Sequence, residues 1–110
     1  MDFQKQKPIY LQIADRLMEQ ILGGQVDDRM PSVRDVAAAM GVNPNTVMRT
    51  FEYLQGEEII YNRRGVGYFV SPDAKNKILA EQRREFLEEE LPLIKQKMHM
   101  LGIGKDELLK

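Results

Sequence analysis

Residues 8–22 carry apolar side chains at every third or fourth position, which is the spacing of an amphipathic helix. Pro8 suits the first position of this helix, because the N–H that proline lacks is unpaired there in any case. Gly23 and Gly24 follow the last apolar residue and predict the end of the helix.

A second helix is predicted over residues 33–40, after a polar connection with room only for a short extended piece near Arg29 and Met30. The hydroxyl of Ser32 is placed to accept a hydrogen bond from an amide of the first turn. Gly41 ends this helix, because glycine readily adopts the left-handed conformation that closes a last turn.

A third helix is predicted over residues 44–55, where Asn43 supplies a capping side chain and Pro44 suits the first helical position. Its apolar residues at helical spacing predict a buried face: Val47, Phe51 and Leu54. The short connection between the second and third helices is typical of a helix-turn-helix, which presents its second helix outward.

Two short strands are predicted next, over residues 59–62 and 68–70, where β-branched and aromatic residues flank a glycine-containing loop. Arg63 and Arg64 are expected at the tip of this hairpin, where glycines let the backbone approach a neighbour such as a minor groove or a row of phosphates. Taken alone, the loop also fits a solvated turn. Helix, short turn, helix and hairpin together predict a winged helix-turn-helix.

Residues 73–110 carry helical patterns only. Five apolar residues, spaced 4, 3, 4 and 3 apart, indicate the narrow seam of a helix that packs on another helix: Leu87, Leu91, Ile94, Met98 and Leu101. Pro92 interrupts this seam, so we expect either a kink or a break with a new helix starting at Pro92. A glycine-ended helix and a fragment of another complete the tail.

The length of 110 residues fits one compact domain with an appendage. We therefore expect an α+β fold that is mainly α, with a winged helix-turn-helix domain in residues 1–72 and a helical dimerisation tail in residues 73–110. No apolar run reaches the roughly 18 residues that cross a bilayer, and the N-terminus lacks the layout of a secretory signal. We expect a cytoplasmic protein with no membrane partner.

Composition narrows the possible chemistry. The absence of cysteine excludes disulfides, thiolate nucleophiles and cysteine-ligated metal sites. His99 is the single histidine, and no nucleophile or pair of carboxylates stands out, so we expect no enzyme, metal site or cofactor. The net charge of −1 argues weakly against a polyanionic partner, but residues 41–51 and 59–72 contain arginine and no acid, which favours a local basic face.

The polar residues of the third helix carry the candidate chemistry. If its apolar face is buried, they lie at its start or on its solvent side: Asn43, Asn45, Thr46, Arg49 and Thr50. Polar side chains and free amides at a helix start bind phosphates, and arginine and asparagine match the base edges of guanine and adenine. The alternative is that Asn43 is only a cap and Arg49 only a solvated charge.

Residues 8–71 resemble the DNA-binding domain of the GntR family of bacterial transcription regulators. Three stretches carry the resemblance: PIYLQIADRL, MPSVRDVAAAMGVNPNTVMRTFEYLQGEEII and RRGVGYFV. The NPNTV version of the third helix and the short helical tail are similar to the YtrA-type subfamily. Pattern and resemblance together predict a DNA-binding set: Ser32, Arg34, Asn43, Asn45, Thr46, Arg49, Arg63, Arg64, Gly65 and Gly67.

The resemblance implies particular roles within this set. Arg34 matches the family arginine that reaches DNA from the second helix, Ser32 matches the cap before it, and residues 63–67 form the wing. Many members carry arginine where this chain has Met48, so the base-reading rules of the family do not transfer. Arg49 either reads a base or grips a phosphate.

We therefore expect a sequence-specific transcription regulator, a repressor, that binds double-stranded DNA at a palindromic operator. The third helix (about 44–55) and the wing (about 62–68) would contact DNA. The tail is too short to enclose a ligand, so its seam is expected to pair with a second copy in a homodimer. The sequence does not indicate which small-molecule effector, if any, acts on the protein. The main alternative is a winged helix that docks a protein partner without specific DNA binding.

Overall fold

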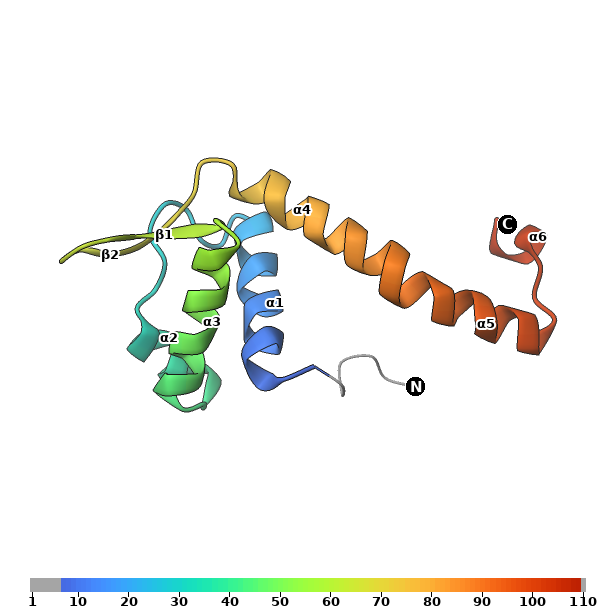
Figure 1. Ribbon diagram of the computed structural model, residues 1–110, viewed down its shortest axis with the longest axis horizontal. Helices are drawn as coiled ribbons and strands as arrows, with labels where there is room; N and C mark the ends of the chain where they lie inside the picture. The colour runs from blue at the N-terminus through green and yellow to red at the C-terminus, as the bar shows by residue number, and fades with distance from the viewer. Residues whose placement is uncertain (1–6, 110) are drawn as a thin grey trace. The chain divides into compact units, whose positions relative to one another are not determined.

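The computed structural model describes residues 7–109 of the 110-residue chain. The chain forms two compact units, one that ends at Ile78 and one that begins at Leu79. The elements, labelled in Figure 1 except for the π-helical segment η2, are α1 (Ile9–Leu22), α2 (Val33–Met40), α3 (Pro44–Gly56), β1 (Ile60–Arg63), β2 (Gly67–Val70), α4 (Ala74–Glu85), η2 (Phe86–Glu90), α5 (Leu91–Leu101) and α6 (Lys105–Leu108). The predicted fold class, mainly helical with a small hairpin sheet and a helical tail, is confirmed.

The first helix begins one residue later than predicted. Pro8 has an extended ψ of 152° and stands before α1 as its N-cap residue. Its carbonyl accepts hydrogen bonds from the amides of Leu11 and Gln12 at 3.1 and 3.2 Å, which pairs two amides of the first turn. The prediction of Pro8 as the first helical residue is therefore wrong, whereas the end at Gly23 is confirmed.

The helix-turn-helix follows its predicted caps. Ser32 Oγ accepts from an amide of the first turn of α2 at 3.0 Å, and Gly41 closes that helix in the left-handed conformation, with a φ of 67°. Asn43 Oδ1 accepts from the amide of Asn45 at 2.8 Å and caps α3. The third helix runs one residue further than predicted.

The hairpin pairs β1 with β2 in antiparallel register, from Ile60 opposite Val70 to Arg63 opposite Gly67. Both strands extend further towards the turn than predicted, so the turn is reduced to residues 64–66. The prediction that Arg63 lies at the tip is therefore wrong, because backbone pairing with Gly67 makes it the last residue of β1.

Residues 28–30 run along the other edge of β2. The amide of Met30 donates to the carbonyl of Tyr68 at 2.9 Å, and Arg29 forms an isolated antiparallel bridge with Phe69. The extended piece predicted near Arg29 and Met30 is confirmed. It attaches the hairpin to the connection that precedes α2.

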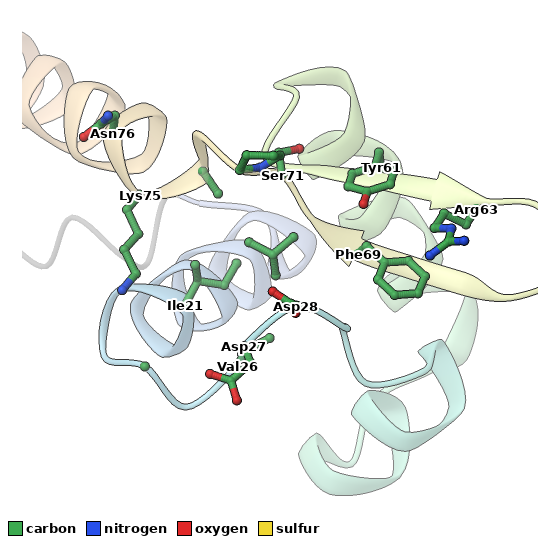
Figure 2. A pocket seen from close by; sticks show the side chains of 14 residues that line it. Ile21, Val26, Asp27, Asp28, Tyr61, Arg63, Phe69, Ser71, Lys75 and Asn76 are labelled. Atoms are coloured by element: carbon green, nitrogen blue, oxygen red, sulfur yellow. The ribbon is translucent and has the colours of Figure 1, made fainter.

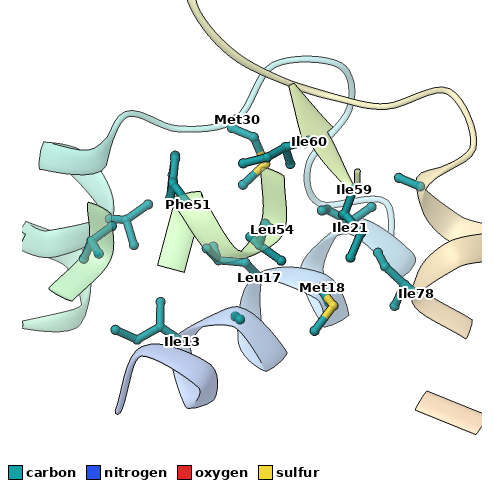
Figure 3. Packing of buried hydrophobic residues seen from close by; sticks show 14 of the residues in the cluster. Ile13, Leu17, Met18, Ile21, Met30, Phe51, Leu54, Ile59, Ile60 and Ile78 are labelled. Atoms are coloured by element: carbon teal, nitrogen blue, oxygen red, sulfur yellow. The ribbon is translucent and has the colours of Figure 1, made fainter. Parts of the chain in front are cut away.

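One hydrophobic core joins α1, α2, α3, the hairpin and the start of α4 (Figure 3). The largest fully buried apolar side chains are Leu17, Ile21, Val47, Phe51, Leu54, Ile59, Ile60 and Ile78. Burying one such side chain contributes about 1.5–3 kcal/mol. The predicted buried face of α3 is confirmed, and Ile78 places the first turns of α4 in this unit.

Pro92 does not break the tail helix. The elements α4, η2 and α5 follow one another without a loop, and Leu91 keeps helical φ and ψ of −58° and −40° directly before the proline. The amide of Leu91 donates to the carbonyl of Phe86, five residues back, which is a π-helical bond. Proline removes a donor and crowds the preceding turn, and the widened π-helical turn lies directly before it. Of the two expected outcomes, the break is therefore wrong.

The end of the tail follows the prediction. Gly102 closes α5 in the left-handed conformation with a φ of 69°, and α6 is a fragment of 4 residues. Within residues 7–109, no helix combines the length and the apolar character that crossing a membrane requires.

Candidate nucleic-acid interface

The start of α3 has its backbone amides already paired, contrary to the expectation that free amides bind a phosphate there. The amide of Asn45 donates to the capping oxygen of Asn43. The amides of Thr46 and Val47 both donate to the Asn43 carbonyl, at 3.0 and 3.2 Å. An anion at this helix start would therefore meet the helix dipole and polar side chains, including the Asn43 amide group that the cap leaves unused.

The solvent side of α3 is mostly polar. Asn43, Asn45 and Arg49 are exposed, and Thr46 is half-buried. Met48 interrupts this polar surface with a side chain that is 38% exposed. An exposed methionine on an outward helix face offers apolar contact, in a place where its neighbours offer hydrogen bonds.

Thr50 does not belong to the solvent side, so its placement there is wrong. It is fully buried, and its hydroxyl donates to the backbone carbonyl of Tyr10 at 2.7 Å, with the Thr46 carbonyl 3.2 Å away. Thr50 was placed there because its side chain is polar, although it stands three residues after Val47 and four before Leu54, on the apolar side of the helix. The packing of α1 against α3 covers Thr50.

The guanidinium of Arg49 lies over the ring of Tyr10, with Cζ 4.1 Å from the ring centroid. Tyr10 in turn contacts Tyr53 edge to face at 6.3 Å. A guanidinium stacked in this way keeps its N–H groups available at the edge of its plane, so the contact orients Arg49 without using its donors. Sequence reasoning missed this contact, for which no local pattern gives a signal.

The second helix presents Arg34 from its first turn. Arg34 is exposed, and within residues 7–109 its side chain makes no hydrogen bond, ion pair or ring contact. Ser32 is also exposed, but its hydroxyl oxygen accepts from the first turn of the helix. Arg34 is therefore a cation with every donor unengaged, beside a serine that already has a capping role.

The two arginines of the hairpin lie in different surroundings. Arg64 is in the exposed turn together with Gly65, whose φ of 78° favours glycine. Arg63 is in β1, and its Cζ lies 5.0 Å from the ring centroid of Phe69, which stacks on Tyr61 at 5.9 Å. Only Arg64 occupies the turn that was predicted for both.

The hairpin is tied to α3 through Tyr68. Its ring meets that of Phe51 edge to face at 5.0 Å, and its hydroxyl lies 3.9 Å from the sulfur of Met48. The wing and the outward side of α3 are therefore adjacent surfaces. The sequence marked Tyr68 only as a strand residue, because its role depends on a contact between elements.

The opposite face of the hairpin borders a groove of about 790 Å³ (Figure 2). Tyr61, Arg63 and Phe69 project from the strands on this side, and Asp28 and Lys75 supply charges of opposite sign. Since strand residues alternate in direction, this groove lies on the other face from Tyr68. It is separate from the surface that α3 and the wing share.

The predicted dimer seam lies in the second unit, where its members are incompletely buried. Leu91, Ile94 and Met98 are half-buried, whereas Leu87 and Leu101 are 46% and 63% exposed. Leaving such a row in contact with water is unfavourable for a single chain. In the same unit His99 is exposed, and residues 7–109 contain no cluster of acidic and histidine side chains that could hold a metal ion.

A helix-turn-helix with an antiparallel hairpin packed beside its second helix defines a winged helix-turn-helix, a class of DNA-binding protein. Residues 9–70 match the family model described as bacterial regulatory proteins of the gntR family. The chain belongs to this family, as the resemblance in its sequence indicated. It is therefore a DNA-binding transcriptional regulator and not an enzyme.

Two curated relatives and a solved structure agree with this assignment. The chain is 37% identical to the HTH-type transcriptional regulator YhcF of Bacillus subtilis, over 98% of this chain and 89% of the relative. It is 34% identical to the HTH-type transcriptional repressor YtrA of the same organism, over 98% of this chain and 84% of the relative. A crystal structure of a GntR-family regulator from Bacteroides thetaiotaomicron has a TM-score of 0.76 and 47% identity, and the match covers 92% of this chain and 89% of that one.

Proposed function

We propose that the protein is a repressor that binds a palindromic operator as a homodimer. The observation that carries this proposal is the exposed polar side of α3 with the wing docked beside it through Tyr68. A relative at 34% identity is named a repressor, which supports the direction of regulation.

In the proposed complex α3 enters the major groove, the usual position of the second helix in this motif. Asn45 matches an adenine edge, and exposed Met48 offers apolar contact to a thymine methyl. Arg49 is drawn towards α1 by Tyr10, so we assign it to a phosphate beside the groove and not to a base. Arg34 is assigned to a second phosphate.

The wing is proposed to contact DNA through its turn. Arg64 and Gly65 occupy that turn, and Gly67 lies at its base. An arginine on a narrow loop suits the minor groove, where the negative potential is strong. Arg63 points along the opposite face of the hairpin, so it contributes less to DNA binding than Arg64 does.

The tail is proposed to join two copies. Its seam keeps the spacing of a helix that packs on another helix, and none of the residues of α5 is buried in the single chain. We assign the dimerising role to residues 73–110, with Ala74 and Ile78 as the anchor that fixes the start of α4 on the DNA-binding unit. Two-fold pairing would match a two-fold operator.

Selection of bound duplexes from a random DNA pool tests this function. The expected product is an inverted repeat whose half-sites are centred about one helical turn, roughly 34 Å, apart. Enrichment of single, unpaired half-sites would overturn the dimer model. A pool that shows no enrichment at all, even at low salt, would favour a protein partner for the winged helix.

A further inference from the structure

One arginine side chain joins the turn of the hairpin to the rest of its domain. Nη2 of Arg29 donates to the backbone carbonyl of Val66 at 2.6 Å, across 37 positions of the chain. Among residues 7–109, this is the one hydrogen bond between the turn, residues 64–66, and a residue outside the hairpin. Its donor is charged, which makes the bond stronger than one between neutral groups.

The backbone around Arg29 supports only part of β2. The amide of Val70 donates to the carbonyl of Asp28 at 2.7 Å, and the amide of Met30 donates to the carbonyl of Tyr68 at 2.9 Å. These bonds stop at Tyr68, so Gly67 at the start of β2 and the turn before it extend beyond them. The side chain of Arg29 spans the remaining distance.

The guanidinium of Arg29 lies beside Gly67. A Cβ at this position would be 3.4 Å from Nη2 and 3.6 Å from Nε of Arg29, and the φ of 140° is one that other residues rarely adopt. The guanidinium also lies 5.9 Å from the Phe69 ring centroid, at the outer limit of a cation–π contact. All these contacts of Arg29 are with the turn and its flanking strand.

We propose that Arg29 is a positioning residue for the wing, which holds the turn in place so that Arg64 is already oriented when DNA arrives. This proposal rests on the proposed contact between the wing and DNA. A cleft of about 350 Å³ separates the turn from the start of α2, and Arg29, Ser32 and Val66 are among the residues that line it. A turn without the Arg29 bond is free to move into this cleft, and ordering it on binding weakens affinity.

Hydrogen exchange of the 110-residue chain tests the holding contact without DNA. The amide of Val66 donates to the carbonyl of Arg63 at 2.9 Å, so its exchange reports opening of the turn. In Arg29→Met we expect this amide to exchange about three- to tenfold faster, with core amides unchanged. Arg34→Met is the matched control, and it should leave the turn as it is. Equal exchange in wild type and Arg29→Met would overturn the proposal.

A double-mutant cycle on a selected operator tests the consequence for binding. Arg29→Met is expected to weaken binding about three- to tenfold in the wild-type background and to have little further effect in Arg64→Ala, because both act through the wing. If Arg29 instead bound a phosphate directly, the losses in affinity from Arg29→Met and Arg64→Ala would multiply in the double variant, and Arg29→Lys would restore affinity. That result would overturn the proposal. A wild type that binds no DNA would contradict the proposed function and leave the exchange result intact.

Discussion

Two neighbouring residues of α3 contact the same residue of α1. Arg49 lies over the ring of Tyr10, and Thr50 donates to the backbone carbonyl of Tyr10. The first contact orients a cation at the surface, and the second joins two helices inside the domain. Residues adjacent in sequence therefore have separate roles, which substitutions can distinguish.

Arg49→Ala is expected to weaken binding to the operator and to a random duplex by the same amount, about 1–3 kcal/mol, because we assign the side chain to a phosphate. The slope of log affinity against log salt should fall in magnitude by about 1. Gel-shift titrations on both duplexes measure this, with Arg16→Ala on the exposed side of α1 as a control of equal charge. A loss confined to the operator would show that Arg49 reads a base.

Arg34→Ala is expected to weaken operator binding by about 1–3 kcal/mol with an unchanged thermal transition, because within residues 7–109 the exposed side chain makes no hydrogen bond, ion pair or ring contact. Titration with operator DNA measures the affinity of the variant, and its melting curve measures the thermal transition. Unchanged affinity would show that Arg34 does not contribute to the DNA interface.

Thr50→Val is expected to lower the free energy of unfolding by about 0.5–1.5 kcal/mol, because it keeps the side-chain volume and removes the hydrogen bond to Tyr10. Urea denaturation measures the change. Thr46→Val, at a half-buried position of the same helix, is the comparison and should cost less. Equal losses in the two variants would mean that the buried hydroxyl adds nothing.

At the scale of elements, the tail is a helical run with a π-helical segment in its middle. Arg84 bonds the carboxylates of Glu81, Glu88 and Glu89, so it links α4 to η2, and the Glu81 hydrogen bond raises the pKa of Arg84 above its ordinary value. These pairs are at the surface and contribute little to stability. The apolar seam, which lacks a cover in the single chain, is the stronger driving force available to this element.

Replacing Leu91 and Ile94 together with glutamate is expected to yield a monomer with weakened operator binding, because charges in a helix seam prevent its burial. Sedimentation measures the oligomeric state, and gel shift measures the affinity. Gln96→Glu with His99→Glu adds the same charges at exposed positions of α5 and should remain dimeric. A dimer that survives the seam variant would place the interface elsewhere.

At the scale of the whole molecule, the net charge of −1 provides no general attraction to DNA. Binding must then come from local cations, and Arg34, Arg49 and Arg64 are exposed on α2, α3 and the wing. Glu57, Glu58 and the acids of the tail lie in other segments of the chain. The affinity of such a protein should depend strongly on counterions released from the contacted phosphates.

The affinity of the dimer for its operator is expected to fall with salt, with a log–log slope of about −5 to −7 for roughly six to eight phosphate contacts. Fluorescence anisotropy across a series of salt concentrations gives the slope. A slope near zero would contradict an interface built on arginine and phosphate.

The helix-turn-helix was predictable because its signals are local. Ser32 and Asn43 bond to amides within three residues, and Gly41 takes its conformation from its own backbone freedom. The side of α3 that faces the core also follows from spacing alone. The position of Arg63 did not, because the length of a strand depends on how far its partner pairs with it.

The sequence by itself determined the order of the elements, the bounds of α2, the caps Ser32 and Asn43, and the family, since each of these follows from short-range patterns. Only the tertiary structure decided that the Thr50 hydroxyl bonds to Tyr10, that Arg49 meets Tyr10, and that Arg29 reaches the hairpin turn. Those contacts join residues 37 to 40 positions apart. They depend on how whole elements pack, and local periodicity contains no information on that.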